Sequence, residues 1–198
     1  KGQILATLES SLEKAAVAAG CPPNAITCMS IAMIEATQEL MKHPDVRVIL
    51  ATGGSGLVRA AYSAGKPAYG VGPGNVPVYI DKSANVAEAV ANIIGSVTFD
   101  NGTVCASEQA VITLQSMKPQ VMEEFRRQGG YFATPEDVKK LNPVCCAGPI
   151  MNPGAVGLSA TKIAEKAGIA VPPNTAVILA ELEGVGRAWP LSMEKLMP

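Results

Sequence analysis

A strand, a glycine-rich turn and a helix, in that order, constrain this chain most. The run VRVILA, at residues 46–51, is compact and rich in β-branched side chains, which is typical of a strand buried in a parallel sheet. Thr52-Gly53-Gly54-Ser55-Gly56 follows as a turn, and a helix is predicted from Leu57 to Ala64, where Gly65 ends it. Because parallel strands need a crossover connection, this order predicts an α/β fold.

The remaining sequence alternates helices and strands with short connections, which favours a layered α/β fold with a largely parallel sheet. Helices are predicted over residues 4–19, 34–42, 85–97, 119–125 and 159–167, and a shorter helix is predicted to begin at Thr134. Strands are predicted over residues 25–30, 76–80, 109–114 and 175–181. Residues 143–153 are predicted to form a loop. The first helix is expected to cover a core, and His43-Pro44 to end the second. Polar residues 81–84 are expected to separate two lobes.

Composition narrows the class of partner. Of the 198 residues, 48% are hydrophobic, which is enough for a sizeable core, and the net charge of −1 provides no basic surface for nucleic acid. No apolar run approaches the roughly 18 residues that indicate a membrane span, and residues 1–20 resemble a soluble amphipathic helix rather than a signal peptide. We therefore expect a cytoplasmic protein with a small-molecule or protein partner.

The five cysteines suit a reducing compartment, because their number is odd and they lack the spacing of a disulfide scaffold. Adjacent Cys145 and Cys146 are poorly arranged to chelate one ion, and His43 is the single histidine, so no metal site is expected. Cys105 differs, because it lies in a glycine-containing loop between a predicted helix and a predicted strand. It is the candidate nucleophile.

A buried, inert thiol is the alternative for Cys105, since free cysteines are often buried. A cysteine protease is a second alternative, but it needs an imidazole beside the thiol, and His43 is expected only to end a helix. Cysteine chemistry without a histidine base favours attack on a reactive carbonyl, such as an aldehyde, over attack on an amide.

Two glycine-rich turns are candidates for ligand contact. The turn at 52–56 precedes a helix, where backbone N–H groups hold anions such as phosphates. It is not the standard dinucleotide fingerprint, because Arg59 occupies the third glycine position. Nucleotide binding and a purely structural turn both remain open here. The cluster at 70–75 either lines a cleft or is a loop that needs positive φ angles.

Four stretches together resemble the CoA-acylating aldehyde dehydrogenases, most closely the aldehyde dehydrogenase part of bacterial bifunctional aldehyde-alcohol dehydrogenases and, next, the related microcompartment enzymes. They are ILATGGSGLVRAAYSAGKPAYGVGPGN at 49–75, TFDNGTVCASEQAVI at 98–112, IAEKAGIAVPPNTAVILAE at 163–181 and PLSMEKLMP at 190–198. The resemblance implies a three-layer fold. Residues 1–82 would be the C-terminal half of a Rossmann-like NAD-binding domain, and residues 83–198 a truncated catalytic domain.

The resemblance also implies a role for each matching residue. Cys105 would attack the aldehyde, a hydride would pass to NAD, and coenzyme A would take the acyl group from the resulting thioester. Glu194 would hold the nicotinamide ribose. The residues against the NAD pyrophosphate would be Thr52, Gly53, Gly54 and Ser55. The complete protein is expected to be a homo-oligomer, in the cytoplasm or inside a bacterial microcompartment.

One departure from the wider superfamily bears on the acyl acceptor. Hydrolytic members carry a water-activating glutamate where this chain has Gly70, and neither Asp nor Glu occurs between Asp45 and Asp81. A thiol acceptor is therefore expected rather than water. The chain begins within a helical pattern and resembles a fragment. A hydrolytic enzyme, an acyl-phosphate reductase and an inactive structural or interaction fragment are the alternatives.

Overall fold

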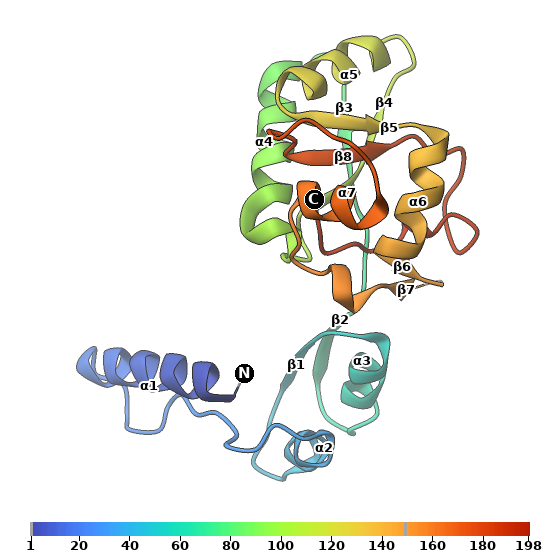
Figure 1. Cartoon of the computed structure of the whole chain (residues 1–198). Helices are drawn as coiled ribbons and strands as arrows, with labels where there is room; N and C mark the ends of the chain where they lie inside the picture. Colours follow the sequence, from blue (N-terminus) through green and yellow to red (C-terminus); the bar gives the residue numbers. More distant parts are fainter. Residues whose placement is uncertain (1, 149) are drawn as a thin grey trace. The chain divides into compact units, whose positions relative to one another are not determined.

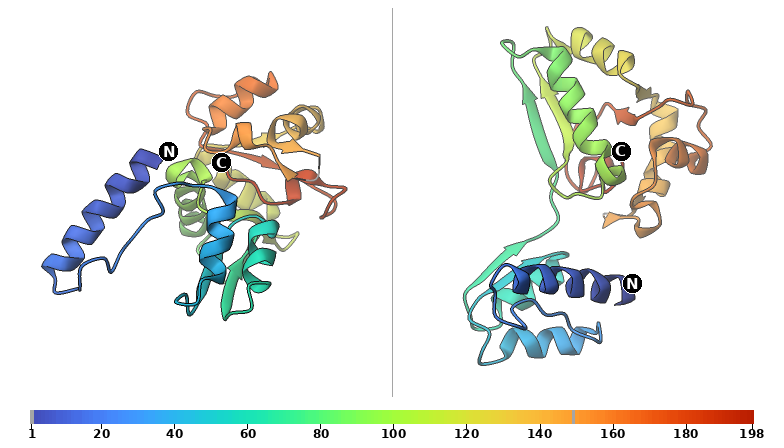
Figure 2. Two further views of the ribbon diagram at one scale, coloured as in Figure 1. Left: turned by 90° about the horizontal axis from the view of Figure 1, so that it is seen from below. Right: turned by 90° about the vertical axis from the view of Figure 1, so that its left-hand side faces the viewer.

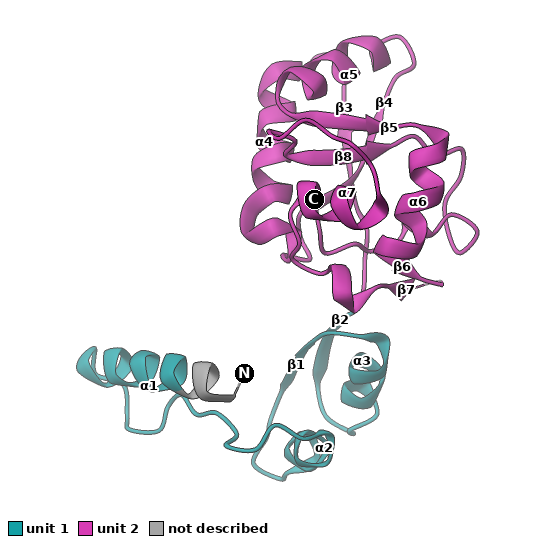
Figure 3. Cartoon of the chain, in the orientation of Figure 1, with its two compact units in different colours: residues 1–72 teal, residues 73–198 magenta. Residues whose placement is uncertain are grey.

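The computed structural model describes residues 2–148 and 150–198, and it divides into two compact units. Unit 1 ends at Gly72, and unit 2 runs from Pro73 to Pro198 (Figure 3). Over the described residues, no helix combines the length and the apolar character needed to cross a lipid bilayer.

Unit 1 is built around a pair of parallel strands. Its elements are α1 (Gly2–Ala18), α2 (Ile34–Lys42), β1 (Ile49–Thr52), α3 (Ser55–Tyr62) and β2 (Ala68–Val71) (Figure 1). β1 and β2 pair in register from Ile49 opposite Ala68 to Thr52 opposite Val71. The buried core consists of Met41, Ile49, Ala51 and Ala61. The strand, turn and helix that constrained the prediction are therefore present, although β1 is shorter than expected and α3 begins at Ser55.

Two predictions for unit 1 are wrong. Residues 25–30 form bends and irregular backbone instead of a strand, and the Ile26 N–H donates to the Glu13 carboxylate at 2.9 Å rather than to a neighbouring strand. The first helix forms but covers no core among the described residues. Leu8 and Leu12 on its apolar face are 59% and 51% exposed.

Unit 2 holds two parallel strand pairs and a short antiparallel hairpin. Its helices are α4 (Val86–Thr98), α5 (Lys118–Arg127), α6 (Pro135–Cys145) and α7 (Ala160–Ala167), with 3-10 turns η1 (Phe99–Gly102), η2 (Pro153–Ala155) and η3 (Pro190–Ser192). Its strands are β3 (Val76–Ile80), β4 (Glu108–Thr113), β5 (Gly130–Ala133), β6 (Cys146–Ala147), β7 (Ile150–Met151) and β8 (Val177–Ala180). β3 pairs with β4 and β5 with β8 in parallel, whereas β6 and β7 are antiparallel.

Unit 2 has the expected layers, with helices on both faces of β5 and β8 (Figure 1). Val177 and Leu179 pack into the core formed with α4 and α5, while the alternate residues Ile178 and Ala180 pack against α6 and α7. Successive side chains of a strand point to opposite faces, so both faces of this pair are covered. α4 also lies along β3 and β4 (Figure 2). The largely parallel, layered α/β prediction is confirmed.

Local signals explain where the helices of unit 2 begin. The Asn85 side chain accepts the Glu88 N–H at 3.4 Å at the start of α4, as the capping pattern predicts. Ser159 caps α7, which ends at Gly168 with φ 65°. The predicted loop at 143–153 is only partly correct. α6 continues through Pro143 to Cys145, and the hairpin β6–β7 follows.

The chain divides into its two compact units between Gly72 and Pro73, and the domain boundary expected at residues 81–84 stays a prediction. β3 pairs with β4 over Val76–Ile80 and so belongs to unit 2. The short strand β5 was not predicted.

Candidate functional site

The nucleophile loop, residues 99–107, connects α4 to β4 and contains the candidate nucleophile. Asp100, Asn101 and Gly102 are three consecutive residues with φ angles of 48°, 51° and 73°. Left-handed conformations are disfavoured for residues with a Cβ atom, and Asp and Asn tolerate them best. Such conformations persist where the surrounding structure holds them, and they gather at functional sites. Thr103 stabilises the left-handed backbone of this loop by donating its hydroxyl to the Asp100 carboxylate at 2.5 Å.

Cys105 lies at the exposed tip of a tight turn after these residues. Ser107 closes the turn twice, because its N–H and its hydroxyl both donate to the Val104 carbonyl, at 3.0 and 2.8 Å. Ser107 is itself buried. The turn therefore fixes the backbone on either side of Cys105 while the thiol faces solvent, and the buried, inert alternative is wrong.

The other cysteines of unit 2 differ in environment. Cys145 and Cys146 are buried, and burial raises the pKa of both thiols, that of Cys145 to about 11. A thiol with so high a pKa carries almost no thiolate near neutrality, and the thiolate is the nucleophile. Of the three cysteines in unit 2, Cys105 is the one that is accessible to a substrate.

The Glu194 segment, residues 191–197, begins within the turn η3 and contains the predicted cofactor carboxylate. Glu194 Oε1 accepts the Gly74 N–H at 3.3 Å, and the Asn75 side chain donates to the Met193 carbonyl at 3.3 Å. Glu194 remains partly exposed, so its carboxylate can still accept hydrogen bonds from ligand hydroxyl groups. The segment is thereby held against Gly74 and Asn75, which lie in unit 2 at the end of the glycine-rich cluster at 70–75.

The nucleophile loop and the Glu194 segment touch directly. A Cβ atom added to Gly102 would lie 2.8 Å from the carbonyl carbon of Met197. Cys105 and Glu194 therefore belong to two segments of unit 2 whose backbones are in van der Waals contact. Sequence reasoning named both residues but missed Gly102 and Met197, where the two segments touch, and Asn75, which donates to the Met193 carbonyl. The one signal for them was the glycine and asparagine content of these turns.

The predicted pyrophosphate turn lies in unit 1 between β1 and α3. Gly54 caps α3 without a side-chain acceptor, and added Cβ atoms at Gly54 and Gly56 would meet nothing within 4 Å. Gly53 donates its N–H to the Val71 carbonyl at 3.0 Å, which fixes the turn against β2. The first turn of α3 therefore has no side chain over it, as a helix N-terminus that holds an anion requires.

Position 70 does not face open space. A Cβ atom at Gly70 would lie 2.5 Å from Val58 Cγ1, and the Tyr62 hydroxyl is bonded to the Gly70 N–H at 3.0 Å. Val71 is the exposed neighbour on the opposite face of β2. Neither position carries a carboxylate.

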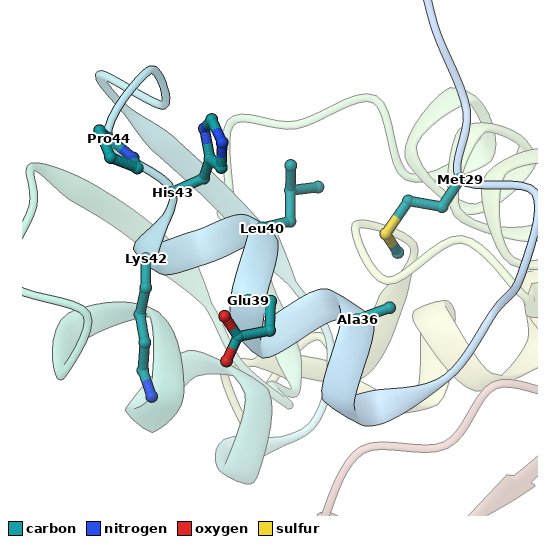
Figure 4. A pocket seen from close by; sticks show the side chains of 7 residues that line it. All are labelled: Met29, Ala36, Glu39, Leu40, Lys42, His43 and Pro44. Atoms are coloured by element: carbon teal, nitrogen blue, oxygen red, sulfur yellow. The ribbon is translucent and has the colours of Figure 1, made fainter.

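A groove in unit 1 lies beside α2 and contains none of the predicted site residues. His43, at its rim, accepts the Asp45 N–H through Nδ1 at 3.3 Å. The side chains that line it are those of Met29, Ala36, Glu39, Leu40, Lys42, His43 and Pro44 (Figure 4). Across residues 2–148 and 150–198, no three His, Cys, Asp or Glu side chains are grouped to hold a metal ion.

Comparisons with known proteins show what the whole chain is similar to. The profile of the aldehyde dehydrogenase family matches residues 6–167. The bifunctional aldehyde-alcohol dehydrogenase AdhE of Escherichia coli K12 is 45% identical over 185 residues, which is 93% of this chain and 21% of that protein. An acetylating aldehyde dehydrogenase from Geobacillus thermoglucosidasius has a crystal structure that superposes with a TM-score of 0.92 at 48% identity, covering 100% of this chain and 44% of that one.

A more distant structure shows chemistry at a cysteine. The propionaldehyde dehydrogenase of Rhodopseudomonas palustris, solved with bound CoA and an acylated cysteine, is 30% identical with a TM-score of 0.77, over 92% of this chain and 43% of that one. The chain spans about a fifth of the E. coli relative and less than half of either solved chain.

Proposed function

This chain belongs to the aldehyde dehydrogenase family, and we propose that it carries the nucleophile and part of the nicotinamide-cofactor site of a CoA-acylating aldehyde dehydrogenase. The observation that carries the proposal is the exposed Cys105 thiol on a locked turn, in a loop that contacts the Glu194 segment. Residues 1–82 would then come from the NAD-binding domain and residues 83–198 from the catalytic domain of a cytoplasmic homo-oligomer.

The chemistry at Cys105 proceeds in three steps. The thiolate attacks the carbonyl carbon of a short-chain aldehyde, and the oxygen takes up a proton to give a thiohemiacetal. That carbon loses its hydride, and the hydroxyl its proton, which leaves a thioester on the Cys105 sulfur. The thiol of CoA displaces this sulfur from the acyl carbon and restores Cys105. The overall reaction converts aldehyde, CoA and NAD⁺ to acyl-CoA, NADH and a proton.

The bound nicotinamide supplies the hydride acceptor, and NAD is the form we propose. Glu194 would accept hydrogen bonds from the ribose hydroxyl groups, since its carboxylate is held in place by the Gly74 N–H but remains partly exposed. The backbone of Thr52, Gly53, Gly54 and Ser55 would face the pyrophosphate, where the uncapped start of α3 favours negative charge.

The choice of acyl acceptor follows from the lack of a water-activating carboxylate at residues 70 and 71 of β2. Hydrolysis of a thioester needs a base that activates water, and positions 70 and 71 are Gly and Val. CoA brings a thiol that is already a good nucleophile once ionised. A thiol acceptor therefore suits this site better than water does.

The nucleophile is tested in the complete protein that contains this chain. We expect Cys105→Ala to abolish CoA-dependent NADH formation while leaving the melting temperature unchanged, because the thiol is exposed and makes no packing contribution. Cys28→Ala, which removes another exposed thiol, is the matched control and should retain full activity. Turnover retained by Cys105→Ala would refute the assignment.

The acceptor is tested by product analysis. Wild-type protein incubated with aldehyde and NAD should form acyl-CoA when CoA is present and little free acid when it is absent. NADH formation supported by inorganic phosphate would indicate an acyl-phosphate reductase, and free acid as the main product would indicate a hydrolytic enzyme. Either result would contradict the proposed acceptor.

A further inference from the structure

The peptide bond that leads into Glu194 is held by two side chains. The carbonyl of Met193, which belongs to this peptide, accepts hydrogen bonds from Lys195 Nζ at 3.1 Å and from Asn75 Nδ2 at 3.3 Å. Lys195 also donates to the Leu191 carbonyl at 2.5 Å. The lysine side chain thus folds back over its own segment and closes it into a loop around Glu194.

The backbone on the C-terminal side of Glu194 is also held by hydrogen bonds. Leu196 donates its N–H to Met151 Sδ at 3.1 Å, and its carbonyl accepts the Gly157 N–H at 2.9 Å. These contacts fix the peptides after Lys195, just as the lysine and Asn75 fix the peptide before Glu194. The position of the Glu194 carboxylate therefore depends on bonds made by neighbouring residues and not only on its own bond to Gly74.

Lys195 is an unusual choice for such a role, because its ammonium group is taken out of water. Desolvation lowers its pKa, and none of the ion pairs among the described residues involves it. The neighbouring thiols of Cys145 and Cys146 are neutral, since burial raises the pKa of each. The ammonium group donates instead to the backbone carbonyls of Leu191 and Met193.

We infer that Lys195 is a positioning residue for the nicotinamide cofactor, acting by fixing the peptide that orients the Glu194 carboxylate. The inference rests on the proposed function, because it takes Glu194 as the residue that meets the ribose. It deepens that function by making cofactor affinity depend on a side chain that touches no ligand. The chemistry at Cys105 does not pass through Lys195.

The test compares Lys195→Met, which keeps a long side chain but loses the donor, with Lys195→Arg, which keeps the charge and donors. Each is made in the complete protein, and the dissociation constant of NADH is measured by fluorescence titration together with kcat and both KM values. Lys195→Met should weaken NADH binding and raise the KM for NAD by about tenfold, as expected for lost bonds from a charged donor. The kcat and the KM for aldehyde should change by less than about twofold.

Lys195→Arg should recover most of the NADH affinity, whereas a merely space-filling role would be met equally well by Met. Lys162→Met, at an exposed lysine on α7 in the same unit, is the matched control and should bind NADH like the wild type. An unchanged NADH affinity in folded Lys195→Met would overturn the inference, as would a loss confined to kcat.

Asn75→Ala covers the case in which Lys195→Met does not fold. It removes the second donor to the Met193 carbonyl and should weaken NADH binding severalfold; unchanged affinity would overturn the inference. Glu194→Gln separates this failure from that of the proposed function. If Glu194→Gln weakens NADH binding and Lys195→Met does not, only the role of Lys195 falls. If wild-type protein binds no NADH, the proposed function falls as well.

Discussion

Gly102 and Met197 are in contact through bare backbone. A Cβ atom on Gly102 would lie 2.8 Å from the carbonyl carbon of Met197 and 3.0 Å from the Val97 carbonyl oxygen, closer than real Cβ atoms pack against backbone. Gly102 also has φ 73°, which residues with a side chain rarely adopt. Two independent constraints therefore demand glycine where the nucleophile loop meets the Glu194 segment.

Replacing Gly102 should damage stability and catalysis together. We expect Gly102→Ala to lower the free energy of unfolding by about 2–4 kcal/mol, from the left-handed backbone and the clash combined, and to reduce turnover because both segments must shift. Urea unfolding and steady-state kinetics measure the two effects. Gly95→Ala is the control, since Gly95 lies in α4 with nothing within 4 Å of an added Cβ, and it should be neutral or stabilising by up to about 1 kcal/mol.

The cysteines should separate into two classes by reactivity. Cys21, Cys28 and Cys105 are exposed, while Cys145 and Cys146 are buried with raised pKa values, about 11 for Cys145. A colorimetric thiol reagent at pH 8 should therefore label three thiols quickly, and the last two only after unfolding. Cys105→Ser should reduce the fast class to two. Equal rates for all five thiols would contradict the burial described here.

Phe125 should contribute strongly to the stability of unit 2. It is 2% exposed and packs edge-on against Phe132, with ring centroids 6.4 Å apart. Phe125→Ala should cost about 3–5 kcal/mol in the free energy of unfolding, through lost burial and the cavity left behind. Phe99, which is 68% exposed, provides the control, and Phe99→Ala should change stability by no more than about 0.5 kcal/mol.

Asp137 should make stability depend on pH in the acid range. Its carboxylate accepts the Thr134 N–H at 3.0 Å and the Tyr131 hydroxyl at 2.9 Å. The bond from the Thr134 backbone, opposed by desolvation and helped by the hydroxyl groups, lowers the pKa of Asp137. A lowered folded-state pKa stabilises the protein above the ordinary carboxyl pKa of about 3.9, and that stability is lost as pH falls through the lowered value.

The variant Asp137→Asn checks this pH dependence. Its melting temperature should lie below that of the wild type at pH 7, and the difference should shrink as the pH is lowered toward 3, where the wild-type carboxyl is protonated. Asp45→Asn, at a fully exposed position of unit 1, should show no such convergence. A difference that stays constant with pH would contradict the role of the Asp137 charge.

Elements with local signals could be predicted from the sequence. The Asn85 and Ser159 caps, Gly168 after α7 and the β-branched run ending at Thr52 each depend on neighbouring residues, and the helices and strand they mark are present. The strand expected at 25–30 is absent, and the Ile26 N–H donates instead to the distant Glu13 carboxylate. Glu13 lies 13 positions before Ile26, so the residues next to the expected strand could not have revealed that contact.

The candidate site also contains residues that the sequence could predict and contacts that it could not. Cys105 stood out because of its loop, and the family resemblance pointed to Glu194, but the contacts that hold their segments join residues far apart in sequence, such as Gly102 and Met197, or Gly74 and Glu194, which are 120 positions apart. Such contacts follow from tertiary packing, which residue patterns do not encode locally. The hydrogen bonds of Lys195 and Asn75 to the Met193 carbonyl therefore became visible only in the structure.

The pairing of β5 with β8 has a consequence for synthesis on the ribosome. β8 ends at Ala180, and the Glu194 segment, which contacts the nucleophile loop, comes later still. Unit 1 can pair its two strands once Val71 has emerged, whereas unit 2 cannot close its central layer until Ala180 has left the exit tunnel. Cys105 thus emerges on a nascent chain well before the turn around it is supported, a period in which its thiol is exposed to oxidants and chaperones alike.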